Sequence, residues 1–96
     1  MAKPIKLTPA LVLRAYEEND RGGALNATAL QSALIQHVFG LPFREWMNFV
    51  HGFEDYRVEP EPRPVWRTES EQEWYLLGRE AQAKLKAVYF PEGRPQ

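Results

Sequence analysis

Apolar side chains recur at intervals of three and four residues in four segments of the chain. This spacing places apolar residues along one face of an amphipathic helix. We predict helices near residues 9–19, 27–39, 42–55 and 69–90, with an extended proline-rich segment at 58–66. The expected fold class is all-α, a small four-helix domain with a helix-turn-helix-like corner where the second helix meets the third.

The predicted helices also have recognisable start and stop signals. Thr8 followed by Pro9 opens the first, because the hydroxyl can accept from a free amide and proline needs no partner at that position. The run 20–23, Asp-Arg-Gly-Gly, is expected to stop it. Asn26 or Thr28 can cap the second helix.

Each predicted helix has a face that we expect to turn toward a shared core. The stripe on the third helix is unusually wide and aromatic, with Met47 beside it, and a small domain has difficulty burying all of it. The expected inward side of the first helix is Leu11, Val12, Ala15 and Tyr16, and the helically spaced residues of the other three are Leu30, Ala33, Leu34, His37 and Val38; Phe43, Trp46, Phe49, Val50 and Phe53; and Trp74, Leu77, Ala81, Leu85 and Val88.

The segment between the third and fourth helices contains prolines at 60, 62 and 64. Proline removes amide donors and favours extended conformations in the residue before it. Two interpretations stay open for this segment. It is either a connecting loop or a semi-rigid arm that presents Trp66 to a partner.

Length and composition favour one domain over residues 1–96, with loose tails at 1–7 and 91–96. With 44% hydrophobic residues and a net charge of −1, the chain has material for a core and no overall basic character that would drive nucleic-acid binding. The N-terminus has only short apolar pieces, so we expect neither a secretion signal nor a membrane span. The absence of cysteine fits a reducing compartment, and cytoplasmic residence is the expectation.

Catalytic and cofactor motifs are lacking. His37 and His51 belong to different predicted helices, and no further ligands complete a metal shell around them. His51 and Asp55 are one helical turn apart, which is ordinary surface pairing. The serines lie outside nucleophile motifs, and the glycine pair is not a phosphate loop. We therefore expect no enzyme activity, no cofactor and no metal.

The corner resembles repressor-type helix-turn-helix proteins in its spacing. A glycine ends one helix, an apolar residue follows, buried positions recur in the next helix, and a second glycine often closes it. The matching residues, within 33–52, are Gly40, Leu41, Trp46, Phe49 and Gly52.

This resemblance has departures. Gln36 stands where the family has a small alanine, and Pro42 stands at the polar cap. The outward positions of the third helix would be Phe43, Arg44, Met47 and Asn48. Arg44 could read guanine and Asn48 adenine, but the other two are apolar and no basic cluster surrounds them.

Exposed aromatic and methionine side chains beside arginine are typical of protein-binding hot spots. We therefore expect a non-enzymatic module that binds a protein partner, either another protein or itself as a homodimer, with DNA as the second candidate. The alternative, that the aromatics only fill the core, stays open residue by residue. In format, the chain resembles small regulators and inhibitors carried by phages and plasmids. The expected partner-binding residues are Phe43, Arg44, Met47, Asn48, His51 and Trp66.

Overall fold

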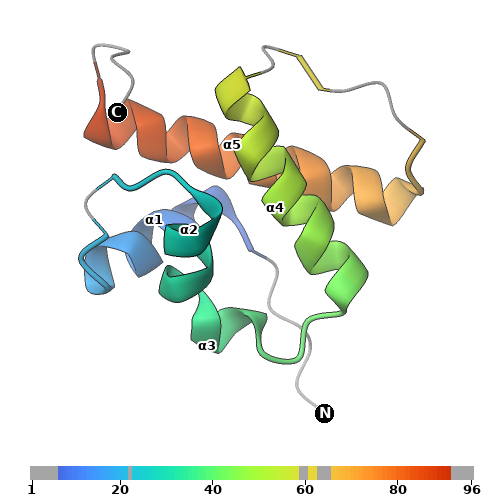
Figure 1. Ribbon diagram of the computed structural model, residues 1–96, viewed down its shortest axis with the longest axis horizontal. Helices are drawn as coiled ribbons and strands as arrows, with labels where there is room; N and C mark the ends of the chain where they lie inside the picture. Colours follow the sequence, from blue (N-terminus) through green and yellow to red (C-terminus); the bar gives the residue numbers. More distant parts are fainter. Residues whose placement is uncertain (1–6, 22, 59–60, 63–65, 92–96) are drawn as a thin grey trace.

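The computed structural model describes residues 7–21, 23–58, 61–62 and 66–91. Within these ranges the structure contains helices and no strand, which confirms the all-α class (Figure 1). The Cα radius of gyration is 12.8 Å, close to the roughly 13 Å expected for a compact chain of this length. The helices are α1 (Pro9–Glu18), α2 (Ala27–Ala33), α3 (Ile35–Val38), α4 (Phe43–Val58) and α5 (Glu69–Tyr89).

The single helix predicted at 27–39 is divided into α2 and α3. The backbone of Leu34 leaves helical geometry, with φ −103° and ψ 12°, while its side chain is completely buried. The Leu34 carbonyl accepts from the amides of both His37 (2.8 Å) and Val38 (2.9 Å), which starts the short helix α3. None of the four α3 residues is fully buried, and Val38 alone among them packs against the core, so little core packing holds α3 in line with α2. The described part of the chain therefore has five helices rather than four.

Helix α1 ends in a Schellman motif, in which two amides beyond the helix bond back to its last turn. The N–H of Arg21 donates to the Tyr16 carbonyl (3.0 Å), and the N–H of Asp20 donates to the Glu17 carbonyl (3.3 Å). Asp20 takes the left-handed position with φ 51°. The helix therefore stops at the run 20–23 as predicted, but Asp20 rather than a glycine of the pair takes the left-handed position.

The turn after α1 packs against the end of α5 and bonds back to α1. Gly23 has φ +87°, and a Cβ atom built on it would lie 3.0 Å from Cβ of Tyr89 at the end of α5. The Tyr16 hydroxyl donates to the Ala24 carbonyl at 2.9 Å. Burial raises the pKa of Tyr16 well above its ordinary value, which keeps this donor protonated.

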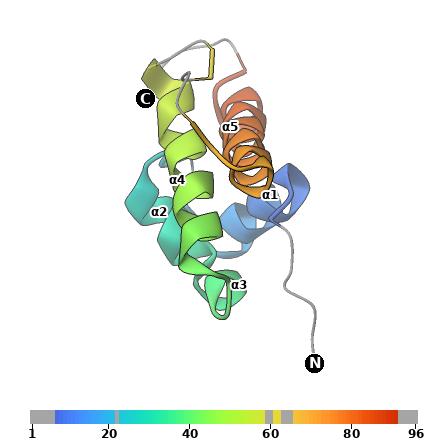
Figure 2. The same ribbon diagram turned by 90° about the vertical axis from the view of Figure 1, so that its right-hand side faces the viewer.

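Helices α4 and α5 cross steeply (Figures 1 and 2). Two glycines, one on each helix, form the crossing point. A Cβ atom built on Gly52 of α4 would meet the backbone carbonyl oxygen of Tyr75 at 1.9 Å. One built on Gly78 of α5 would meet the carbonyl oxygen of Phe49 at 2.0 Å. The two backbones therefore touch at a distance that only glycine permits.

This crossing changes the interpretation of Gly52. The helix-turn-helix spacing suggested a glycine that closes the third helix, but Gly52 lies inside α4, which continues to Val58. Helix α4 is thus longer than the predicted 42–55, and Val58 belongs to it rather than to the extended segment. The end has a simple steric reason, because Pro60 disfavours helical geometry at residue 59.

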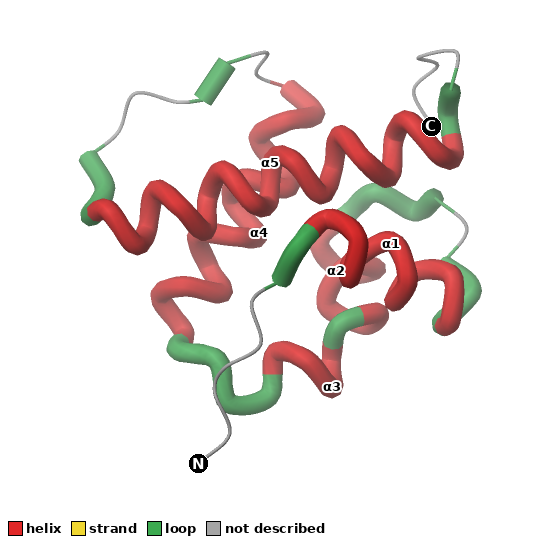
Figure 3. Tube along the Cα trace, turned by 180° about the vertical axis from the view of Figure 1, so that it is seen from behind, coloured by secondary structure: helices red, strands yellow, loops and turns green. Residues whose placement is uncertain are grey.

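Helix α5 is buried on a broader face than predicted because it packs against α4 and also against α1 (Figure 3). Ala81 and Leu85 are fully buried as expected, whereas Val88 is 47% exposed. Trp74 and Leu77 are half-buried. The face toward α4 adds four buried residues, none of which we expected in the core: Tyr75, Gly78, Arg79 and Gln82.

At the N-terminus, Leu7 is completely buried in the core although it falls within the predicted loose tail. It precedes Thr8, whose hydroxyl accepts from the Leu11 amide at 3.2 Å as predicted. Segments 1–6 and 92–96 of the two predicted tails lie outside the described residues.

Candidate functional site

The segment 35–43, from the start of α3 to the start of α4, carries three exposed large apolar side chains, which we call the apolar corner. Ile35 is 60% exposed, Phe39 91% and Phe43 76%. The segment lies at one end of the molecule, where the chain turns from α3 into α4 (Figure 1). Exposed Phe is unusual because burying an aromatic ring typically contributes about 1.5–3 kcal/mol. This corner is therefore the first candidate for a binding surface.

The local backbone explains why these side chains face solvent. Phe39 ends α3 in an extended conformation (φ −63°, ψ 117°), and Gly40 follows with φ +93° and with no atom within 4 Å of the place that a Cβ would take. The Leu41 amide donates to the Val38 carbonyl at 3.0 Å, which closes the turn. Val38 and Leu41 pack against the core. With the inner side occupied by these two residues, Phe39 is directed outward.

The wide aromatic stripe of α4 divides between the core and the surface. Phe49 and Phe53 are completely buried and Val50 nearly so. Trp46 is half-buried and stacks on Phe49, with ring centroids 6.1 Å apart. The core-filling interpretation is therefore correct for these residues. Phe43, at the start of the same helix, remains on the surface.

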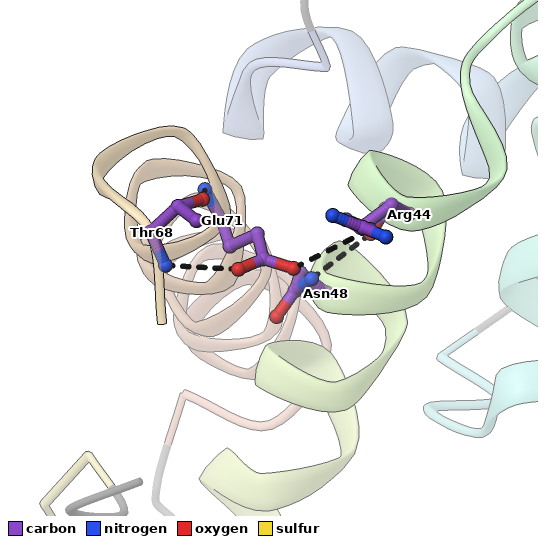
Figure 4. Close-up of polar contacts among 4 residues, drawn as sticks. All are labelled: Arg44, Asn48, Thr68 and Glu71. Atoms are coloured by element: carbon purple, nitrogen blue, oxygen red, sulfur yellow. Dashed lines mark hydrogen bonds and ion pairs between the residues drawn. The ribbon is translucent and has the colours of Figure 1, made fainter. Parts of the chain in front are cut away.

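Arg44 and Asn48 meet the first turn of α5 (Figure 4). The Arg44 Nε lies 3.8 Å from Oε2 of Glu71, and the Arg44 side chain is 75% exposed. Asn48 Nδ2 donates to the Arg44 carbonyl at 2.9 Å, one turn earlier in α4. Two side chains expected to read bases are thus placed beside a carboxylate.

Glu71 has a structural role in addition to this contact. Its Oε1 accepts from the Thr68 amide (2.8 Å) while the Thr68 hydroxyl accepts from the Glu71 amide (3.2 Å), which completes a capping box. The Thr68 amide lowers the pKa of the Glu71 carboxyl, and Arg44 and Asn48 contribute to the same direction. Glu71 therefore ties the start of α5 to the start of α4.

The other expected site residues lie around this junction. Met47 is half-buried and His51 is exposed on α4. Trp66 is 85% exposed, two residues before the cap Thr68. The structure thus brings Arg44, Asn48 and the segment that follows Trp66 to one end of the α4–α5 pair.

Trp66 is followed directly by an anchored residue, Arg67. The Arg67 guanidinium carbon lies 3.6 Å from the centroid of the Tyr75 ring, close enough for a cation–π interaction. Tyr75 is fully buried, and its hydroxyl donates to the Asp55 carboxylate at 2.8 Å. The segment 66–68 is therefore anchored on α4 and α5, although residues 59–60 and 63–65 of the predicted arm lie outside the described ranges.

Sequence reasoning missed Phe39 and Ile35 as surface candidates. Their signal was nevertheless present, because Leu30, Ala33, Leu34 and Val38 define an inward stripe from which both residues deviate. Large apolar residues off the stripe of an amphipathic helix must either find another partner or face solvent. Their position off the stripe was therefore the available sign of a surface role.

Neither a metal site nor a membrane span has support in the described part of the chain. No group of three or more His, Cys, Asp or Glu residues there could hold a metal ion. No helix in the same residues is long and apolar enough to span a bilayer. The helix-turn-helix-like corner stays a prediction, since the helix before the turn is the four-residue α3 and the helix after it packs mainly on α5.

Comparisons with protein-family models, with curated proteins and with solved structures found no match, so the function is inferred from the geometry of the chain itself.

Proposed function

We propose that this protein is a small non-enzymatic regulatory or inhibitory module that binds a protein partner through the apolar corner. The observation that carries the proposal is the exposure of Ile35, Phe39 and Phe43 within nine consecutive residues. Binding energy at protein interfaces concentrates in a few large side chains that become buried on association. The nearby Arg44 guanidinium, 75% exposed, supplies a polar contact at the rim of such a surface.

The test is affinity capture from lysate of the source organism with the wild-type protein and two corner variants, Phe39→Asp and Phe43→Asp. Both side chains are exposed, so the fold should survive, and circular dichroism melting checks this. We expect a partner that wild type captures and both variants lose. A matched control is Val88→Asp, which places the same charge at an exposed apolar position on α5.

A partner lost by the two corner variants and retained by Val88→Asp supports the proposal. If folded Phe39→Asp and Phe43→Asp retain every protein that wild type captures, the corner is not the binding surface. Size-exclusion chromatography of the same set tests the homodimer form, in which the partner is a second copy.

Double-stranded DNA is the second candidate partner. In its favour, the Arg44 side chain is exposed on the first turn of α4, where a recognition helix would contact bases. Against it, the Glu71 carboxylate lies 3.8 Å from Arg44 and repels phosphates. A DNA regulator would bind duplex with an affinity that falls steeply with salt, and Arg44→Ala would relax its base preference. Absence of binding at low salt removes this candidate.

A further inference from the structure

A polar depression lies beside the apolar corner, where α1 ends and α2 passes into α3. Its volume is about 260 Å³, below the roughly 300–1,000 Å³ of pockets that hold small molecules and cofactors. That size suits a single side chain. The lining residues are Glu18, Asn19, Ala33, Ile35, Gln36 and His37.

The lining is rich in hydrogen-bond acceptors. The Nδ2 of Asn19 is occupied, because it donates to the carbonyls of Ala15 (2.9 Å) and Ala33 (3.3 Å). The atom of that amide left for a ligand is the acceptor Oδ1. Glu18 adds an exposed carboxylate, and Gln36 adds a second amide. Several acceptors and one negative charge around a small depression match a planar cation with several donors.

The depression is continuous with the apolar corner through Ile35. This side chain lines the depression and is also one of the three exposed residues of the corner. A segment that covers Ile35 as well as Phe39 would border the depression lined by Glu18 and Asn19. Ile35 is therefore the residue at which a partner on the apolar corner would also reach the polar depression.

Resting on the proposed function, we infer that the depression accepts an arginine side chain of the protein partner that docks on the apolar corner. Arginine fits better than lysine because its guanidinium presents five donors in a fixed plane to acceptors on different sides. The Glu18 carboxylate would take one edge of the guanidinium, and the amide oxygens of Asn19 and Gln36 would take the remaining donors. The partner segment is then basic at one position and apolar at its neighbours.

The experiment is a titration of the ¹⁵N-labelled protein, followed by NMR, with N-acetyl-arginine methylamide at about pH 8, where histidine side chains are ordinarily neutral. N-acetyl-citrulline methylamide, which has the same shape without the charge, is the control ligand. We expect saturable shifts of the Asn19 and Gln36 side-chain amides and of the Ile35 backbone amide with the arginine compound. The citrulline compound should bind at least about tenfold more weakly, since charge-assisted hydrogen bonds are the stronger kind.

A matched pair of variants locates the charge. Glu18→Gln should weaken the arginine compound by about fivefold or more, whereas Glu17→Gln, which removes a neighbouring exposed charge outside the depression, should leave binding unchanged. The inference is overturned if no saturable shift occurs at about 50 mM ligand, far above the millimolar dissociation constant of a weak fragment. The inference is also overturned if the arginine and citrulline compounds bind equally well, or if Glu18→Gln and Glu17→Gln bind the arginine compound equally well.

The result is independent of partner capture. If the arginine compound binds in the depression but the corner variants keep every captured protein, the proposed function fails and the site stands. If the corner variants lose a partner but the arginine compound does not bind, the proposed function stands and the depression is not its arginine receptor.

Discussion

Asp20 occupies the left-handed position that ends α1, with φ 51°. A residue with a Cβ atom is strained there by about 1 kcal/mol relative to glycine, and a negative charge also lies unfavourably at a helix C-terminus. We expect Asp20→Gly to raise the free energy of unfolding by about 0.5–1 kcal/mol in urea titrations, since glycine's extra chain entropy offsets part of the gain.

Asp20→Ala separates the effect of backbone strain from the effect of the negative charge. Alanine removes the charge but keeps the Cβ atom at the same φ angle. Its stability should therefore lie below that of the glycine variant. Equal stabilities for the two variants would contradict a role for backbone strain.

Glu71 makes the stability of the start of α5 depend on pH. Its folded-state pKa lies below the ordinary value of 4.5, chiefly because the Thr68 amide donates to the carboxylate. A lowered folded pKa contributes stability that is complete above the unfolded pKa and is lost as pH falls through the folded one. We expect urea stability to decline below about pH 4.5 with a contribution from this group.

Glu71→Gln isolates that contribution. Glutamine can accept the same hydrogen bond from Thr68 but carries no charge that titrates. The stability difference between wild type and Glu71→Gln should shrink as pH falls through the acid range. A difference that stays constant from neutral to acidic pH would show that the Glu71 charge does not stabilise the fold.

At the level of elements, the contact between α4 and α5 depends on Gly52 and Gly78. In an exposed helix, replacing glycine by alanine stabilises by about 1 kcal/mol. Here the new methyl group would lie 1.9 Å from the Tyr75 carbonyl oxygen for Gly52→Ala and 2.0 Å from that of Phe49 for Gly78→Ala. The two helices would have to separate, so we expect each variant to lose about 2–3 kcal/mol.

The control for the crossing is Glu54→Ala, an exposed position on α4 that should change stability by less than about 0.5 kcal/mol. Thermal and urea unfolding of the three variants provide the measurement. Stabilisation by either glycine replacement would mean that the backbones of α4 and α5 do not touch at this point.

Helices α1, α2 and α5 were largely predictable, because each carries a local signal at its start. Thr8 caps α1 through its hydroxyl, Asn26 caps α2, and Thr68 caps α5, all from residue types with known preferences. What could not be read locally was the glycine crossing. A glycine in a helical pattern signals a possible end, and only the position of a second helix reveals that Gly52 is a contact.

The same limit applies to the core and to the candidate site. Gln82 is completely buried, with Nε2 donating to the Phe53 carbonyl at 2.8 Å, because α4 supplies an acceptor there. From the polarity of its side chain alone, Gln82 would be expected on the surface. Conversely, Phe39 is apolar and 91% exposed because Val38 and Leu41 take the inner side of the turn. Pairing between elements, which periodicity does not contain, decided the burial of Gln82, whereas the position of Phe39 off the apolar stripe was a signal that periodicity did contain.

At the scale of the whole molecule, stability should differ between the apolar corner and the long helices. Helix α3 is a single turn with no buried residue and no side-chain cap, whereas α5 is buried against both α4 and α1. Regions with few buried contacts open locally at a free energy below that of global unfolding. We expect the hydrogen-bonded amides of His37, Val38 and Leu41 to exchange through such local openings, far faster than the amide of Leu85.

Gly78→Ala tests whether these openings are independent, provided that the variant remains folded. The free energy that protects the Leu85 amide from exchange should fall by as much as the free energy of unfolding measured in urea. The protection of the three amides of the corner should not change. If the amides of the corner lose as much protection as the Leu85 amide, the corner opens only when the whole domain unfolds. Independent opening would mean that the apolar corner adjusts its shape without disturbing the α4–α5 crossing, so a partner could order α3 at a cost confined to one turn of helix.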